Sequence, residues 1–361
     1  MKIFEVMTDN EYEQLIFFHD KETGLKGITC IHNTVLGPAL GGTRLWNYES
    51  EEDAIRDVTR LARGMTFKNA GAGLNLGGGK TVLIGDPHKV KSEGYFRALG
   101  RFVQSLNGRY ITAEDVNTNT KDMNFIGMET SHVTGLEGKS GNPSPVTAWG
   151  VFKGLQASIE EAFGTTDVSK FSYAVQGAGQ TGYYLINYLI EHGAKRICFT
   201  ELNPAHVERM KKEHPEVKFV KAPDIYSQDV DVFCPCALGG LLDEKTIPKI
   251  KAKVIAGSAN NILKDEKAHG DLIMKLNKVY APDFIINAGG VINVYDELLG
   301  YDKNRAMRNV ELIYDRLRQI YAIAKKKHIN TQMAAIHFAQ ERIRGIGEVR
   351  KNFIPRCHHH K

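Results

Sequence analysis

The spacing of apolar residues differs between the two halves of the chain. In the first half, residues 14–18, 26–31 and 109–112 have the composition of strands. Apolar side chains at helical spacing predict a helix that begins at Ser50 and another over residues 96–106. The segment that contains Gly37-Pro38 and Gly41-Gly42 is typical of turns. Together these elements predict an α+β domain over residues 1–135.

In the second half, strands and helices alternate. A helix is expected to begin near Val146. Short apolar strands are expected after it, over residues 171–176, 197–200, 219–220, 230–234 and 254–255. This alternation is typical of a parallel sheet with helices on both faces. The segment 135–145, which is rich in glycine, serine and proline, predicts a linker or hinge in front of it.

Two amphipathic helices are expected near the end of the chain, over residues 303–326 and 331–343. These helices are additional to those that cover the parallel sheet, so we expect them to return toward the first domain. The sequence therefore predicts an α/β fold of two domains. The first is an α+β domain, formed by residues 1–135 and a returning helix in 329–361. The second is a Rossmann-type, doubly wound domain over residues 136–328.

Composition excludes several classes of protein. The 47 basic and 42 acidic residues are scattered along the chain, so it lacks the basic stripe of a nucleic-acid-binding protein. Five cysteines without framework spacing indicate a reducing compartment, and no run approaches the ~20 apolar residues of a membrane span. We expect a cytoplasmic protein without membrane or nucleic-acid partners. The ending, Cys357 with His358–His360, is interpreted as a tail, and no metal site is expected.

A glycine fingerprint marks a dinucleotide site. The pattern Gly177-x-Gly179-x-x-Gly182 lies between an expected strand and an expected helix, where the glycines allow a tight turn and the helix N-terminus attracts phosphate. Its variable positions are Ala178, Gln180 and Thr181. Glu201 lies about 20 residues further on, where an acid binds the ribose hydroxyls. A carboxylate there favours NAD over NADP, although Lys195 and Arg196 are close in sequence. The alternative is a plain strand-to-helix turn.

A second glycine-rich segment, Gly77-Gly78-Gly79-Lys80, precedes an apolar run that we interpret as a strand. A phosphate-binding P-loop would need glycine at the position of Leu74 and a helix after Lys80, so that alternative fails. A lysine on such a glycine platform is partly desolvated, which favours the neutral amine and lets it act as an acid or base. Lys68 and Asp115 are candidates to bind a substrate carboxylate and to shuttle a proton beside it.

At this point the chain resembles the amino acid dehydrogenases of the glutamate, leucine, phenylalanine and valine family, and is most similar to its leucine-specific branch. The segments that carry the resemblance cover nearly the whole chain: Gly37 to Arg44, Gly77 to Pro87, Thr112 to Val116, Pro143 to Thr147, Gly257 to Asn261 and Asn287 to Val291. One departure is Asn117, which stands where the family usually has glycine just after Asp115.

The resemblance implies roles for particular residues. Lys80 would be the acid/base that activates water, Asp115 would relay a proton to or from the amine, and Lys68 with the Gly41-Gly42 backbone would bind the substrate carboxylate. The further implied contacts are Asn261 for substrate, Thr147 and Asn287 for the nicotinamide amide, and Ala237 and Asn260 along the cofactor. It also implies that the first domain binds the substrate and forms the oligomer contacts, that NAD is the cofactor, that a catalytic cleft closes between the two domains, and that the protein is a homo-octamer.

By the same resemblance, four apolar positions form the side-chain pocket: Leu40, Ala113, Val291 and Val294. A glutamate substrate would bury a second carboxylate without a partner there. Relatives specific for phenylalanine tend to have glycine at the position of Ala113, so alanine favours a branched aliphatic chain. The expected reaction is reversible NAD-dependent oxidative deamination of leucine, valine and isoleucine to 2-oxo acids and ammonia. The alternatives are a phenylalanine dehydrogenase and a non-catalytic dinucleotide sensor.

Overall fold

The computed structural model describes residues 2–237 and 239–349, which fold into two units. The first unit contains the described residues up to Val133 and those from Phe338 onward, and the second runs from Thr134 to His337. The sequence placed these boundaries at residues 135 and 329. The expected tail at His358–His360 lies outside the described residues.

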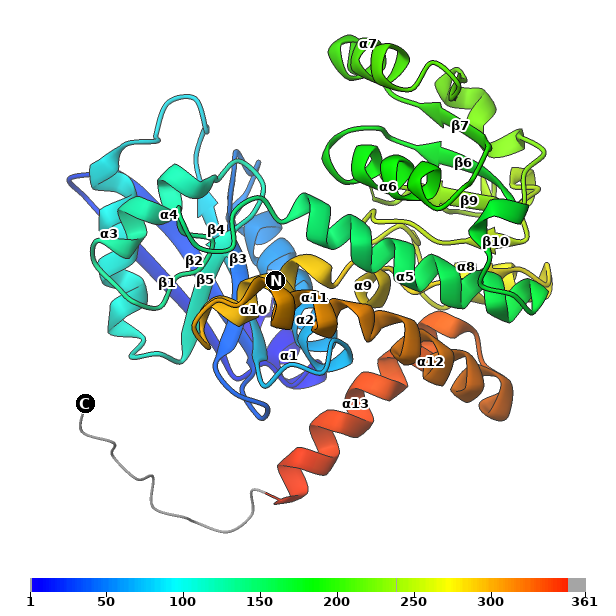
Figure 1. Cartoon of the computed structure of the whole chain (residues 1–361). Helices are drawn as coiled ribbons and strands as arrows, with labels where there is room; N and C mark the ends of the chain where they lie inside the picture. Colours follow the sequence, from blue (N-terminus) through cyan, green and yellow to red (C-terminus); the bar gives the residue numbers. More distant parts are fainter. Residues whose placement is uncertain (1, 238, 350–361) are drawn as a thin grey trace. The chain divides into compact units, whose positions relative to one another are not determined.

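The first unit is built on a mixed five-stranded sheet of order β1-β2-β4-β3-β5 (Figure 1). Its strands are β1 (Gln14–Asp20), β2 (Leu25–Asn33), β3 (Ala39–Trp46), β4 (Gly77–Ile84) and β5 (Tyr110–Glu114). The pairs β1/β2 and β2/β4 are antiparallel, whereas β3 is parallel to both of its neighbours. Helix α2 (Glu51–Gly71) covers one face, and α3 (Glu93–Ser105) with α4 (Thr120–Gly127) covers the other.

Helix α2 forms where the sequence predicts it. The Ser50 hydroxyl accepts a hydrogen bond from the Asp53 backbone N–H, and the acidic first turn suits the helix dipole. Its buried residues Ala54, Val58 and Ala62 pack with Ile28 and Val82 of the sheet. Lys68 lies in the last turn, as expected. The helix therefore carries Lys68 to the end of its course over the sheet.

The expectation of a turn at Gly41-Gly42 is wrong, because both residues lie inside β3. A Cβ at Gly41 would collide with the carbonyl oxygen of Gly79, so the strands come closer than a side chain allows. Gly77 to Lys80 likewise belong to β4 and do not precede it. Glycine is read as a turn signal from sequence, but here it permits close strand packing.

The second unit contains a parallel six-stranded sheet of order β11-β10-β9-β6-β7-β8. Its strands are β6 (Ser172–Gln176), β7 (Arg196–Thr200), β8 (Lys218–Phe219), β9 (Val232–Pro235), β10 (Val254–Ile255) and β11 (Val279–Tyr280). The chain runs outward from β6 to β8 on one side and from β9 to β11 on the other, which is the doubly wound order. This confirms the predicted parallel sheet.

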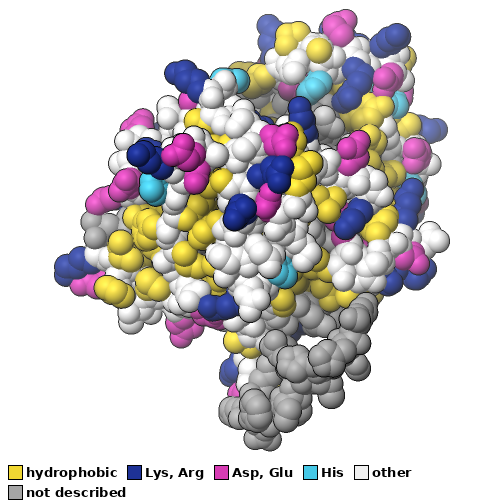
Figure 2. Space-filling model, turned by 90° about the vertical axis from the view of Figure 1, so that its left-hand side faces the viewer, with side chains coloured by type: hydrophobic (Ala, Val, Ile, Leu, Met, Phe, Trp, Pro, Cys, Tyr) yellow, Lys and Arg dark blue, Asp and Glu magenta, His cyan; other side chains and the backbone are white. Residues whose placement is uncertain are grey.

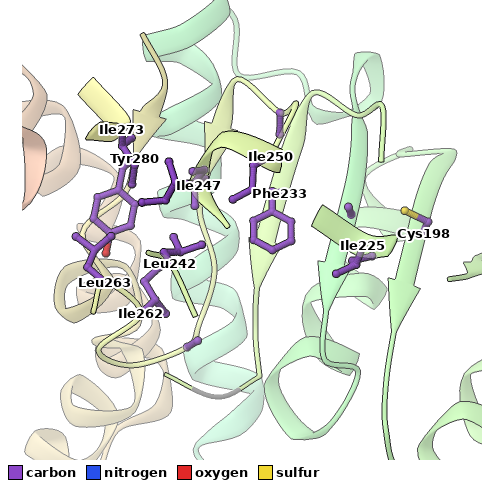
Figure 3. Close-up of a cluster of buried hydrophobic side chains, with 14 of the residues drawn as sticks. Cys198, Ile225, Phe233, Leu242, Ile247, Ile250, Ile262, Leu263, Ile273 and Tyr280 are labelled. Carbon is purple, nitrogen blue, oxygen red and sulfur yellow. The ribbon is translucent and has the colours of Figure 1, made fainter. Parts of the chain in front are cut away.

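Helices flank this sheet (Figure 1). They are α5 (Ser144–Phe163), α6 (Gln180–Glu191), α7 (Pro204–Glu213), α8 (Ala268–Lys275), α9 (Asp283–Ile286), α10 (Gly289–Glu297), α11 (Lys303–Glu311) and α12 (Ile313–Lys327). A buried cluster holds one side of the sheet together, with Phe233 of β9 and Tyr280 of β11 among residues of the connecting segments such as Ile247 and Ile262 (Figure 3).

The single helix predicted over residues 303–326 is two helices, α11 and α12, with Leu312 between them. Val310 is buried before the break and Ile313 and Leu317 after it, so the apolar spacing continues across the junction and does not reveal it. The next helix, α13, spans Thr331–Val349, and the described residues from Phe338 onward belong to the first unit.

Charged side chains of both signs are scattered over the surface that Figure 2 shows. On this face, acidic and basic side chains are intermixed, without a continuous stripe of one sign. Among the described residues, none of the helices combines the length and apolar character needed to cross a bilayer.

Candidate functional site

Lys80 and Asp115 form an ion pair in the first unit. Lys80 lies on β4, is 5% exposed, and places its Nζ 2.9 Å from Asp115 Oδ2 just after β5. Strand β3 runs between these two strands, and a Cβ at Gly42 would come within 2.9 Å of the Asp115 Cβ. The glycine therefore leaves the space in which the lysine and the carboxylate pair across β3.

A second cation contacts the same carboxylate. Arg44 Nε donates to Asp115 Oδ2 at 2.9 Å, while its Nη1 donates to Asp57 Oδ2 on α2 at 2.9 Å. Tyr48 Oη also donates to Asp57 Oδ2, at 2.7 Å. Burial alone would raise the pKa of Asp115, but Lys80 and Arg44 outweigh it and lower that pKa to about 2. Asp115 is therefore a carboxylate throughout the neutral range.

The turn after Asp115 accommodates Asn117. This residue adopts a left-handed backbone, with φ of 59°, which asparagine tolerates better than most residues. Its Nδ2 donates to the Leu45 carbonyl at 3.0 Å. Thr118 accepts from the Asp115 N–H at 2.9 Å and donates to the Thr43 carbonyl at 2.9 Å. The substitution of the family's glycine is thus compatible with a turn that is anchored to β3.

Lys68 is brought to the same region by its neighbour in α2. Asn69 is fully buried, and its Nδ2 donates to the Gly77 carbonyl at 2.6 Å and to the Leu40 carbonyl at 3.4 Å. These bonds fix the last turn of α2 onto β3 and β4. Lys68 itself is partly buried there, beside the strands that carry Gly41 and Lys80.

The expected pocket residues lie in both units. Leu40 on β3 is 2% exposed, and Ala113 on β5 is paired with Gly42 in the register of the sheet. Since alternate residues of a strand share a face, Leu40, Gly42 and Ala113 lie on one face of this sheet. Val291 and Val294 lie on α10 of the second unit and are partly buried.

The glycine fingerprint forms the turn between β6 and α6. Gly177 has a φ of 94°, and a Cβ at Gly182 would collide with the Gly177 carbonyl oxygen. Beside Gly179 there is open space, because the atoms nearest to a Cβ there are Glu201 Oε2 at 3.9 Å and His206 Nδ1 at 4.0 Å. The turn lies at the point where the strand order reverses, which is where doubly wound sheets bind ligands.

Glu201 directly follows β7, and its carboxylate lies beside this turn. Its Oε2 accepts from the Ala178 N–H at 3.0 Å, and its Oε1 accepts from the N–H groups of Leu202 and Asn203 at 2.7 and 2.9 Å. Arg196 begins β7, with Lys195 just before it. Because a strand rises roughly 3.3 Å per residue, Arg196 and Lys195 are about 16 and 20 Å of chain away from Glu201, at the opposite strand end.

The remaining expected cofactor residues follow β9 and β10 or begin α5. Ala237 touches the turn, since a Cβ at Gly177 would lie 3.0 Å from the Ala237 Cβ. Thr147 in the first turn of α5 lies beside the start of α10, where a Cβ at Gly290 would be 3.0 Å from its Oγ1. Asn260 and Asn261 are exposed, and Asn261 has a φ of 49°.

Asn287 offers a buried acceptor. It is 4% exposed, and its Nδ2 donates to Asn260 Oδ1 at 2.9 Å and to the Ser258 carbonyl at 3.2 Å. Within residues 2–237 and 239–349, its Oδ1 is buried and has no hydrogen-bond partner. A buried oxygen without a partner costs free energy, so it fits a ligand that donates a hydrogen bond, such as a carboxamide.

Comparison with known proteins places this site in a family. The model for the Glu/Leu/Phe/Val dehydrogenase dimerisation domain matches residues 12–132, and the Glutamate/Leucine/Phenylalanine/Valine dehydrogenase model matches residues 197–346. The chain belongs to the Glu/Leu/Phe/Val dehydrogenase family. The leucine dehydrogenase of Geobacillus stearothermophilus is 54% identical, over 99% of this chain and 98% of that protein.

Two solved structures agree with this dehydrogenase fold. The crystal structure of L-tryptophan dehydrogenase from Nostoc punctiforme has a TM-score of 0.85 at 42% identity, over 95% of this chain and 99% of that one. The hetero-hexameric glutamate dehydrogenase from Thermus thermophilus has a TM-score of 0.77 at 20% identity, over 95% and 91%, and shares the fold. The predicted two-domain α/β architecture is thereby confirmed.

This amino acid dehydrogenase depends on a pyridine nucleotide, and the second unit fits one. The glycine turn leaves room beside Gly179 for a pyrophosphate, and the unpartnered Oδ1 of Asn287 suits a nicotinamide amide. The described part of the chain contains no group of three or more histidine, cysteine, aspartate or glutamate residues that could hold a metal ion.

Three residues of the site had no role in the sequence analysis. Arg44 lies in a segment that carried the resemblance. It is two residues after Gly42, and residues two apart on a strand lie on the same face of a sheet, so a strand assignment would have placed Arg44 on the face of Gly42. Asn69 belongs to none of the motifs, so nothing in the sequence shows that it anchors α2. Arg209 on α7 places its Nη2 3.4 Å from the carbonyls of Ala178 and Gly179, a contact that only the fold creates.

Proposed function

We propose that this chain catalyses the reversible NAD-dependent oxidative deamination of branched-chain L-amino acids. Leucine, valine and isoleucine would give the 2-oxo acid and ammonia. The observation that carries the proposal is the ion pair of the buried Lys80 with Asp115, beside the apolar residues Leu40 and Ala113. The curated leucine dehydrogenases are 52–54% identical to this chain, whereas a phenylalanine dehydrogenase is 42% identical.

In this proposal, the first unit binds the substrate and moves protons. Lys68, with the Gly41 and Gly42 backbone, would bind the substrate carboxylate. A pyridine nucleotide held by the glycine turn and Asn287 would supply the acceptor for the substrate's Cα hydride, and the oxidised substrate is an imine. Lys80, as the free amine, would take a proton from a water while the water oxygen bonds to the imine carbon, and Asp115 would relay that proton to the departing amine. One water is consumed, and ammonia leaves as the carbonyl forms.

The role of Arg44 follows from its two carboxylate partners. It contacts Asp115 and Asp57 at once, so it fixes the catalytic carboxylate to α2. A carboxylate held by two cations keeps one position while the proton is transferred. We therefore assign Arg44 as a positioning residue for Asp115.

Specificity for an aliphatic substrate side chain is proposed to come from a pocket that is lined by apolar residues and has no charged group. Leu40 and Ala113 offer only apolar atoms, and Val291 and Val294 are proposed to complete the pocket. A second substrate carboxylate would lose its hydration without gaining a partner there. Leucine, isoleucine and valine differ by at most one methylene or its placement, which is worth ~1–3 kcal/mol, so overlapping activity is expected.

The preference for NAD over NADP is proposed from Glu201. Backbone N–H groups hold this carboxylate beside Gly179, where it would accept the ribose hydroxyls and repel a 2′-phosphate. Lys195 and Arg196, which left the question open in sequence, lie at the other end of β7. Arg209 is the closer cation to the turn, but its Nη2 contacts backbone carbonyls there and its guanidinium lies over the Tyr183 ring at 3.9 Å.

We also propose a homo-oligomer in the cytoplasm, an octamer by family resemblance. The dimerisation domain named by the matched family model supports an oligomer. Cys30, Cys198, Cys234 and Cys236 are free thiols, which is the usual state in a reducing compartment.

The decisive experiment is NADH formation with leucine, valine, isoleucine, phenylalanine and glutamate as separate substrates. We expect the three branched-chain amino acids to have the highest kcat/KM and glutamate to show no turnover. A preference for phenylalanine would establish the alternative dehydrogenase. Dinucleotide binding without turnover of any of the five would support the sensor and contradict the proposed reaction.

A further inference from the structure

A cavity of about 640 Å³ lies in the second unit, away from the glycine turn. Lys253 and Lys278 line it, and they immediately precede β10 and β11. The glycine turn instead follows β6. Because all strands of this sheet are parallel, the cavity lies at the N-terminal ends of the strands and the turn lies at their C-terminal ends. The cavity is therefore separate from the proposed cofactor site.

The two lysines occupy neighbouring positions on adjacent strands. Val254 pairs with Val279 in the parallel register, so Lys253 and Lys278 precede a matched pair. Adjacent strands are about 4.8 Å apart, and like charges in such positions repel. Lys278 Nζ donates to the Ala252 carbonyl at 2.8 Å, and Lys253 Nζ donates to the Asn277 carbonyl. Each ammonium is thus held by the segment that leads into the other strand, and keeps further N–H donors.

No carboxylate neutralises this pair within the described residues. Neither Lys253 nor Lys278 has an acidic oxygen within 4.0 Å in residues 2–237 and 239–349. Lys325 on the cavity wall is paired with Glu161 at 2.6 Å, which uses the acid that lines the cavity. Burial and then the charge of Lys253 lower the pKa of Lys278. An anion in the cavity would relieve this repulsion.

The rest of the lining is suited to an organic group. Apolar side chains of α8, β11 and the segment after α12 contribute to it, including Ile273, Val279 and Ile329. The volume falls in the range of about 300 to 1,000 Å³ that is usual for small-molecule sites, and is larger than a bare inorganic anion requires. A ligand that fits would combine two negative charges with an apolar body.

We propose that this cavity binds a small organic phosphate, with Lys253 and Lys278 as the phosphate-binding pair and the apolar wall around the organic group. A phosphate monoester carries about −1.5 to −2 charges at pH 7 and three acceptor oxygens, which matches two ammonium groups. A monocarboxylate would neutralise only one of them. The site does not depend on the reaction proposed above.

Calorimetric titration of the full-length protein tests the proposal. The protein is saturated with NADH, so that phosphate cannot enter the proposed cofactor site, and is titrated with phenyl phosphate, inorganic phosphate and benzoate. We expect saturable binding of phenyl phosphate, tighter than that of either other anion. Equal binding of benzoate, or no saturable binding of phenyl phosphate, would overturn the proposal.

Variants assign the binding to the two lysines. The double variant Lys253→Gln, Lys278→Gln should lose about tenfold or more in affinity for phenyl phosphate, because charge-assisted hydrogen bonds are removed. Lys326→Gln is the matched control, since Lys326 is at the end of α12 but does not line the cavity. An unchanged affinity in the double variant would refute the assignment.

A second measurement uses the unaltered protein, in case the double variant does not fold. Acetic anhydride acetylates exposed lysine amines, and mass spectrometry reports each position. Phenyl phosphate should protect Lys253 and Lys278 and leave Lys326 unprotected. Equal acetylation of all three with and without phenyl phosphate would contradict the proposed site.

Discussion

Arg44 and Lys80 each place a nitrogen 2.9 Å from the same carboxylate oxygen, Asp115 Oδ2. The two cations come from neighbouring strands, β3 and β4, and the carboxylate follows β5. Their joint charge outweighs the cost of burying Asp115 and lowers its pKa from the ordinary 3.8 to about 2. The first unit therefore contains a carboxylate whose charge state is set by the fold.

This arrangement makes the first prediction, a dependence of stability on acid pH. A depressed pKa stabilises the folded state above the unfolded pKa of about 3.8, and that contribution is lost as pH falls toward 2. The shift corresponds to roughly 2 kcal/mol. Asp115→Asn should therefore show a smaller fall in the free energy of unfolding between pH 6 and pH 3, measured by urea denaturation.

Arg44→Met provides the comparison for that measurement. Removing one of the two cations should raise the pKa of Asp115, so that the acid-dependent loss begins at higher pH than in the unaltered protein. Asp167→Asn is a control for an exposed carboxylate of the second unit, whose pKa is lowered mainly by hydrogen bonds from Ser169. If Asp115→Asn and the unaltered protein lose the same free energy on acidification, the ion pair does not stabilise the fold.

The second prediction concerns the acid/base role of Lys80. Lys80→Ala should lower kcat for leucine by about 10² to 10⁴, the usual contribution of a positioned acid or base, while NADH binding measured by fluorescence persists. Lys91→Ala is a matched control because Lys91 also pairs with an aspartate, Asp122, in the same unit. Substantial remaining turnover in Lys80→Ala would rule out the proposed role.

The site shows which parts of a structure can be predicted from sequence. Residues 171–182 and 50–68 followed known strand, turn and cap chemistry, so the expected turn and helix are present where their signals were. β3 was missed because Gly41 and Gly42 resemble a turn unless the neighbouring strands are known. Asn69 and Arg44 act through partners on other elements, and such long-range pairs leave no periodic signal in the chain.

The third prediction tests the side-chain pocket. Ala113→Gly removes a methyl group from a buried position on β5 and should increase the ratio of kcat/KM for phenylalanine to that for leucine. About tenfold is expected, since one methylene in such a pocket is worth ~1–3 kcal/mol. Ala39→Gly removes a buried methyl from β3 at a position of the opposite parity to Leu40 and should leave the ratio unchanged. A constant ratio in Ala113→Gly would show that Ala113 does not face the substrate.

The fourth prediction concerns the cofactor. Glu201→Ser removes the carboxylate beside Gly179 and, with it, the repulsion toward a 2′-phosphate, so the ratio of kcat/KM for NAD to that for NADP should fall. Because Glu201 also accepts the Ala178 N–H, weaker binding of both dinucleotides is expected, and the ratio is the informative quantity. Glu208→Ser on α7 is the control, since Glu208 pairs with the exposed Lys211. If Glu201→Ser keeps the ratio of the unaltered protein, the preference for NAD has another source, and Arg209 is the next residue to substitute because its guanidinium contacts the same turn.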